Sequence, residues 1–102
     1  MKYQFVVQFA GSSLAAYDAM IALEEALIRG LPESSEVDGH DMGAGELNIF
    51  INTNDPEQTF EQVRALLESA GTFEEARIAY REFTRNDYTP LWPKDLRSFR
   101  VA

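Results

Sequence analysis

Apolar and polar side chains alternate near the start of the chain, over residues 2–9, KYQFVVQF. The larger apolar side chains occupy the odd positions, and the even positions carry Lys2, Gln4, Val6 and Gln8. A period of two is typical of a β-strand with one buried face. Three more strands are predicted over residues 35–41, 46–53 and 76–84, with residues 42–45 as a hairpin turn.

Two segments with helical spacing separate these strands. Gly11-Ser12-Ser13 breaks the first strand and offers a hydroxyl N-cap, and the helix that follows ends near residue 29, before Gly30. Glu24 falls within the bulky apolar arc of this helix, so it either reaches the rim or is a buried carboxylate with a partner. A second helix is predicted from the capping sequence Asp55-Pro56-Glu57-Gln58 to Gly71.

The resulting order, β-α-β-β-α-β within 102 residues, is that of one domain. With right-handed crossovers it predicts a ferredoxin-like α+β sandwich: a four-stranded antiparallel sheet in the order 4-1-3-2, with two helices on one face. Residues 85–102 are expected to form an extended C-terminal tail. The expected core lies between helices and sheet and contains Phe5, Val7, Phe9, Ile21, Ile28, Leu47, Ile49, Ile51, Phe60, Val63, Leu67 and Ile78.

The other side of the sheet, which we call the outer face, is expected to carry a polar cluster. If Val37 points toward the helices, strict alternation places Asp38 and His40 on the outer face. We expect them to join Gln4, Gln8, Glu46, Asn48, Arg77 and Arg81 around Val6 and Phe50. The cluster is interpreted as a subunit interface, a solvated or tail-covered surface, or a ligand or catalytic site. For an enzyme the candidate residues are His40, Asp38, Glu46 and Arg81, because histidine near a carboxylate serves in acid–base chemistry.

Residues 87–93, DYTPLWP, are also unusual, because the aromatic residues Tyr88 and Trp92 lie in a short segment that contains two prolines. We expect Trp92 to pack on the outer face or on a second subunit. The candidate ligand- or partner-binding residues are Asp38, His40, Asp41, Glu46, Asn48, Phe50, Arg77, Arg81, Tyr88 and Trp92.

Charge and composition exclude several classes of function. The net charge of −8 argues against non-specific nucleic-acid binding, and the absence of cysteine excludes disulfides and thiolate chemistry. No metal site is expected, because one His among Asp38, Asp41 and Glu46 lacks the usual ligand spacing, and no cofactor motif is present. The N-terminal residues resemble a strand rather than a signal peptide or membrane span, which predicts a cytoplasmic protein without a membrane partner.

The charge is unevenly distributed along the chain. Residues 1–76 carry 14 acidic and 3 basic side chains, a net of −11, whereas residues 77–102 carry 3 acidic and 6 basic, a net of +3. Either the basic end lies against the acidic body, or an acidic surface faces a basic partner and speeds association with it.

The hairpin and the tail carry a resemblance to a known family. The stretches VDGHDMGAGELNIFI, DPEQTFEQVRALLE and YTPLWP resemble a family of small bacterial proteins of about this length that share a VDGHD-x-G-x-GE-x-NIFI hairpin and a YT-x-LWP tail. The family brings no established activity with it, and the resemblance implies that hairpin and tail act as one unit.

Two functions remain open from the sequence. The first is a non-enzymatic binding protein that forms a homodimer or neutralises a basic protein partner, comparable in size and charge to small immunity proteins. The second is a small enzyme or ligand-binding module that uses the hairpin cluster. The absence of an obvious nucleophile or cofactor motif favours the first.

Overall fold

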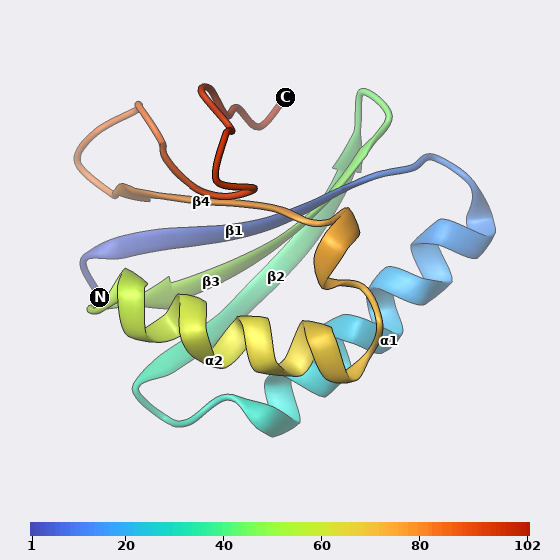
Figure 1. Ribbon diagram of the computed structural model, residues 1–102, viewed down its shortest axis with the longest axis horizontal. Coiled ribbons are helices and arrows are strands. Elements are labelled where there is room, and N and C mark those ends of the chain that lie inside the picture. The colour runs from blue at the N-terminus through green and yellow to red at the C-terminus, as the bar shows by residue number, and fades with distance from the viewer.

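The computed structural model describes all 102 residues as an α+β fold in which two helices cover one face of an antiparallel sheet (Figure 1). In chain order the elements are β1 (Tyr3–Ala10), α1 (Leu14–Gly30), β2 (Ser35–Gly43), β3 (Glu46–Thr53), α2 (Pro56–Ser69), the 3-10 turn η1 (Phe73–Glu75), β4 (Arg77–Glu82) and β5 (Thr89–Trp92). Both predicted helix starts are confirmed, because Ser13 accepts a hydrogen bond from Ala16 N–H and Asp55 accepts one from Gln58 N–H. None of the helices is long and apolar enough to cross a membrane.

The sheet has five strands in the order β2-β3-β1-β4-β5, which corrects the predicted four-stranded sheet. The first four strands keep the expected neighbours, and β5 pairs antiparallel with β4. The sequence pattern did not predict β5, because Pro90 lacks a backbone N–H donor and proline is rare inside strands. An edge strand tolerates this loss, because its outward-facing backbone groups need no partner strand.

The hairpin between β2 and β3 is tighter than predicted. Residues 44–45 alone form its turn, and both have positive φ, 54° for Ala44 and 75° for Gly45. Two-residue turns of this kind match the right-handed twist of the flanking strands. As a result β2 continues to Gly43, beyond its predicted end at residue 41.

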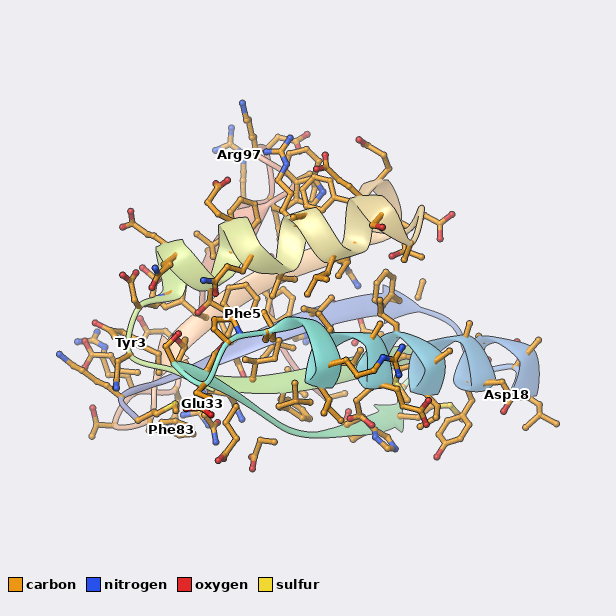
Figure 2. All side chains as sticks on the ribbon, turned by 90° about the horizontal axis from the view of Figure 1, so that it is seen from below. Tyr3, Phe5, Asp18, Glu33, Phe83 and Arg97 are labelled. Carbon is orange, nitrogen blue, oxygen red and sulfur yellow. The ribbon has the colours of Figure 1, made fainter.

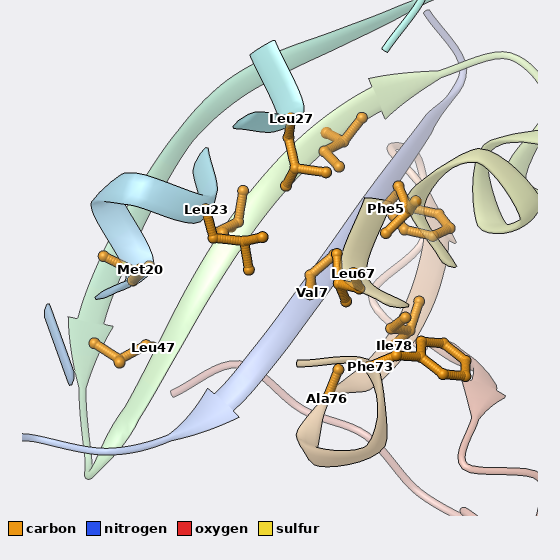
Figure 3. Close-up of a cluster of buried hydrophobic side chains, with 13 residues drawn as sticks. Phe5, Val7, Met20, Leu23, Leu27, Leu47, Leu67, Phe73, Ala76 and Ile78 are labelled. Carbon is orange, nitrogen blue, oxygen red and sulfur yellow. The ribbon is translucent and has the colours of Figure 1, made fainter. Parts of the chain in front are cut away.

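The hydrophobic core lies between the sheet and the two helices, as Figure 3 shows. Figure 2 places Phe5 within this layer and Asp18 and Arg97 at the periphery. The core contains Phe5, Val7, Met20, Leu23, Leu27, Leu47, Ile49, Ile51, Val63, Leu67, Phe73, Ala76 and Ile78.

The buried stripe of α1 differs from the prediction. Its buried residues are Met20, Leu23 and Leu27, at spacings of three and four, whereas Ile28 is 59% exposed. The prediction that Ile28 lies in the core is therefore wrong, and Phe9, Ile21 and Phe60 are only partly buried against the core. One helix face covers the sheet, so a broad apolar arc is not buried across its whole width.

The outer face is covered in part by the chain's own C-terminal residues (Figure 1). Val6 and Ala79 point away from the helices, yet both are fully buried. On the same face, the side chain of Gln8 donates a hydrogen bond to the Arg100 carbonyl oxygen at 3.0 Å, and the rings of Tyr88 and Phe99 meet edge to face. Val6 lies on the outer face as predicted, but its burial leaves it unavailable to the subunit interface that was one interpretation of this face.

Candidate functional site

A β-bulge in β2 decides which hairpin side chains face the helices. Val37 pairs with Ile51, but Gly39 pairs with Phe50, so that Asp38 has no partner residue on β3. One extra residue reverses the alternation of every later position. His40 consequently lies opposite Ile49 and faces the helices, and the prediction that it lies on the outer face is wrong. Asp38 is exposed at the bulge.

His40 joins two residues of α1 in a compact polar cluster. Its Nδ1 lies 3.0 Å from both carboxylate oxygens of Glu24, and its Nε2 lies 3.4 Å from the Tyr17 hydroxyl. The Glu24 side chain is only 12% exposed and that of His40 is 29% exposed. Glu24 is therefore the carboxylate with a partner, and the cluster connects α1 to β2.

The carboxylate–imidazole–hydroxyl order of this cluster is also the order found in acid–base relays. Such a relay needs a place for a substrate beside it. The three main hollows of the surface are lined by other residues and contain none of Tyr17, Glu24 and His40. The cluster thus has the geometry of a structural connection between helix and sheet.

On the outer face, four polar residues form a row across four strands: Asp41 on β2, Asn48 on β3, Gln8 on β1 and Arg77 on β4. Asn48 Nδ2 donates to Asp41 at 2.9 Å, and Gln8 Nε2 donates to Asn48 Oδ1 at 3.0 Å. Arg77 donates to Glu46 at 2.6 Å. Gln8 and Asn48 are 1% and 2% exposed, so the middle of this row is a buried, hydrogen-bonded network, whereas Asp41 and Arg77 at its two ends reach solvent.

A second row holds the connection between β4 and β5. The Gln4 side-chain oxygen accepts hydrogen bonds from Arg81 Nε and from the Tyr88 hydroxyl, both at 3.0 Å. The Arg81 guanidinium also donates to the carbonyl oxygens of Glu82, Phe83 and Arg85. Arg81 and Tyr88 are therefore engaged in fixing this loop. Between the two rows lies Phe50, which is half-buried opposite Val6.

Trp92 lies on the helix side of the sheet, which corrects the expected packing on the outer face. It pairs with Ile78 and stacks on Phe73 with ring centroids 4.4 Å apart and planes inclined by 24°. Arg64 of α2 lies over the Phe73 ring at 4.9 Å from its centroid. Since Trp92 is on β5 and His40 on β2, they occupy opposite edges of the sheet. His40 of the hairpin and Trp92 of the tail are therefore not in contact.

The four candidate catalytic residues do not converge. His40 faces α1, Glu46 is paired with Arg77 on the outer face, Arg81 binds loop carbonyls, and Asp38 sits at the sheet edge. No group of three or more acidic or histidine side chains is placed to hold a metal ion.

An acidic surface surrounds β2. Residues 30–63 contain eight aspartates and glutamates and neither lysine nor arginine. Of the eight, Glu46 alone forms an ion pair, with Arg77. Glu33, Glu36, Asp38 and Asp41 are exposed on β2 or just before it. The three cations near the C-terminus, Lys94, Arg97 and Arg100, form no ion pair, so the tail does not neutralise this surface.

Comparison with known proteins gives no relative: no family model, curated protein or solved structure matches the chain. The resemblance to the small bacterial family therefore stays a prediction. Fold and surface together define the chain as a small α+β protein with an acidic edge strand.

Proposed function

We propose that this chain, whose arrangement we interpret as ferredoxin-like, is a non-enzymatic protein-binding domain that binds a basic protein segment at β2. The observation that carries the proposal is the run of exposed acidic side chains on a strand at the edge of the sheet. For a basic partner these carboxylates supply attraction at long range and orientation at contact.

The backbone of β2 supports the same assignment. As the outermost strand, β2 has β3 as its only strand neighbour, and an edge strand can accept a further extended chain through main-chain hydrogen bonds. A second copy of β2 would bring Glu36, Asp38 and Asp41 against like charges, which disfavours homodimerisation at this edge. A segment rich in lysine or arginine meets opposite charges there.

The bulge at Asp38 fits this selectivity. Bulges and charges on edge strands are devices that prevent unwanted strand pairing. At β2 the only charged side chains beside the bulge are carboxylates. They disfavour pairing with neutral or acidic strands, and a basic segment is the complementary partner.

The test uses calorimetric titration with a blocked peptide of alternating lysine and valine. Replacing Glu33, Glu36 and Asp38 with lysine reverses three charges on β2 or just before it without disturbing the Asp41–Asn48 hydrogen bond, and we expect affinity to fall by about tenfold or more. The matched control replaces Glu57, Glu61 and Glu68 on α2 with lysine, which changes the net charge equally. We expect this control to lose less than about threefold.

Equal losses in the two triple variants would show that the peptide responds to total charge and would refute a site at β2. Affinity that does not change when ionic strength is raised would refute the electrostatic basis of recognition.

A further inference from the structure

A polar hollow of about 550 Å³ lies on the outer face, between the row of polar residues and the C-terminal tail. Its lining residues are Gln8, Glu46, Arg77, Ser98, Phe99 and Arg100. They come from β1, β3, β4 and the tail, so segments distant in sequence build one concavity. The proposed binding at β2 does not use it.

The donors of this hollow are largely free. The Arg100 guanidinium forms no hydrogen bond or ion pair, although the backbone carbonyl of the same residue is held by Gln8. Arg77 makes a single hydrogen bond, to Glu46 at 2.6 Å, which leaves its other N–H groups unpaired. The Ser98 hydroxyl is a further donor without a partner in the chain. Two guanidinium groups against one carboxylate give the hollow a positive charge in a chain of net charge −8.

The backbone that carries Arg100 and the side chain of Arg77 are both held in place. Gln8, which is 1% exposed, donates both to Asn48 and to the Arg100 carbonyl oxygen, so this buried residue of β1 holds the tail beside the hollow. Phe99 is held by its edge-to-face contact with Tyr88, at 5.1 Å between ring centroids. Glu46, whose side chain is 22% exposed, anchors Arg77. Arg77, which is already held by Glu46, therefore loses little freedom when a ligand arrives, and the fixed backbone keeps Arg100 beside the hollow.

We propose that this hollow binds the oxyanion group of a small molecule, a phosphate or a carboxylate, between Arg77 and Arg100, with Ser98 as a further donor. Guanidinium groups present parallel N–H donors that match the two oxygens of such a group. The Glu46 carboxylate opposes a second negative charge beside Arg77. The ligand therefore places its oxyanion toward Arg100 and Ser98.

The experiment is an NMR titration of the full chain, with backbone amides and arginine Nε–H groups as the signals. Inorganic phosphate is added in one arm and acetate in the other, with chloride used to keep ionic strength constant. We expect saturable shifts at Arg77, Ser98, Phe99 and Arg100, with a dissociation constant of about 1 mM for the preferred anion. The arm that saturates first identifies the class of oxyanion.

Two substitutions in the tail provide a matched comparison. Arg100→Gln should weaken binding by about tenfold, and Arg100→Lys should weaken it less, because lysine keeps the charge without the planar pair of donors. Arg97→Gln removes an equal charge three residues away, outside the hollow, and should leave affinity within about twofold. Each of these side chains is exposed, so folding is expected to survive the changes.

Shifts that fail to saturate in both arms would overturn the proposal. So would equal losses of affinity in Arg97→Gln and Arg100→Gln, because a general attraction to the basic tail would then explain the response.

Discussion

Ile49 and Ile28 carry the same side chain in different surroundings, so truncating each of them tests the packing of the fold. Ile49 is fully buried at the centre of the sheet, where it lies between Val7 of β1 and His40 of β2. Ile28 is 59% exposed on α1. Periodicity alone assigns both residues to the core.

The magnitudes follow from burial. Truncating a fully buried isoleucine to alanine costs about 2–5 kcal/mol, since contacts are lost and a cavity remains. For 102 residues the entropy of unfolding is about 0.2 kcal/mol/K, so a loss of about 3 kcal/mol lowers the melting temperature by about 14 °C. Ile28→Ala loses little burial and gains helix propensity, so its change should stay within about 0.5 kcal/mol.

Urea denaturation of both variants, followed by far-UV circular dichroism, measures the two free energies of unfolding. We expect a large loss of unfolding free energy for Ile49→Ala and a small change for Ile28→Ala. Comparable destabilisation of the two variants would show that the assigned face of α1 is wrong.

Three further changes test the contact of Phe99 with the outer face, the contact of Glu24 with His40, and the pairing of Arg85 with Asp87. Phe99→Ala should cost about 1–3 kcal/mol and speed amide exchange in the centre of β1, measured by hydrogen exchange, because the tail covers the outer face there; unchanged exchange would contradict this cover. A double-mutant cycle of Glu24→Gln and His40→Gln should give a coupling free energy of about 0.5–1.5 kcal/mol in denaturation experiments. The value is modest because solvent screens His40, which is 29% exposed. Additive effects of the two substitutions would contradict a stabilising contact between α1 and β2. A backbone hydrogen bond and the Arg85 guanidinium lower the pKa of Asp87. The contribution of Asp87 to stability is present above its unfolded pKa and is lost as pH falls through its lower folded pKa. Arg85→Gln should therefore raise the pKa of Asp87 in a carbon-13 titration. An unchanged pKa would contradict the role given to Arg85.

Period-two and helical patterns predicted the first four strands, the two helices and their neighbours in the sheet, because each element buries one face against the other layer. The position of His40 could not be predicted by alternation, since a single unpaired residue reverses the faces of a strand. Gly39 was the available signal. Its φ of 140° is unusual for other residues, and glycine inside a strand pattern often marks a bulge.

Glu24 shows how an anomaly in the sequence gained meaning from tertiary contacts. Its place within the apolar arc of α1 pointed to a partner, but only the bulge brings His40 onto the same side of the sheet. Similarly, Trp92 was expected on the outer face or on a second subunit, whereas it packs on Phe73 on the helix side of the sheet. Local patterns did not define that side, because Leu91 interrupts the pairing register of β5 with β4.

The lining of the outer-face hollow could not be found by motif or spacing. Gln8 and Arg100 are 92 positions apart in sequence, and the hydrogen bond that joins them depends on the path of the tail. Arg77 and Glu46 were expected on the same face, and their ion pair agrees with that placement.

In the proposed function, the acidic edge strand β2 is the surface that binds a basic partner. The most direct measurement is amide NMR of the full chain during titration with the alternating lysine–valine peptide. We expect the largest shifts, together with new protection from exchange, to fall on residues 35–43. Largest shifts on residues 56–69 of α2, or shifts spread evenly over all acidic residues, would contradict it.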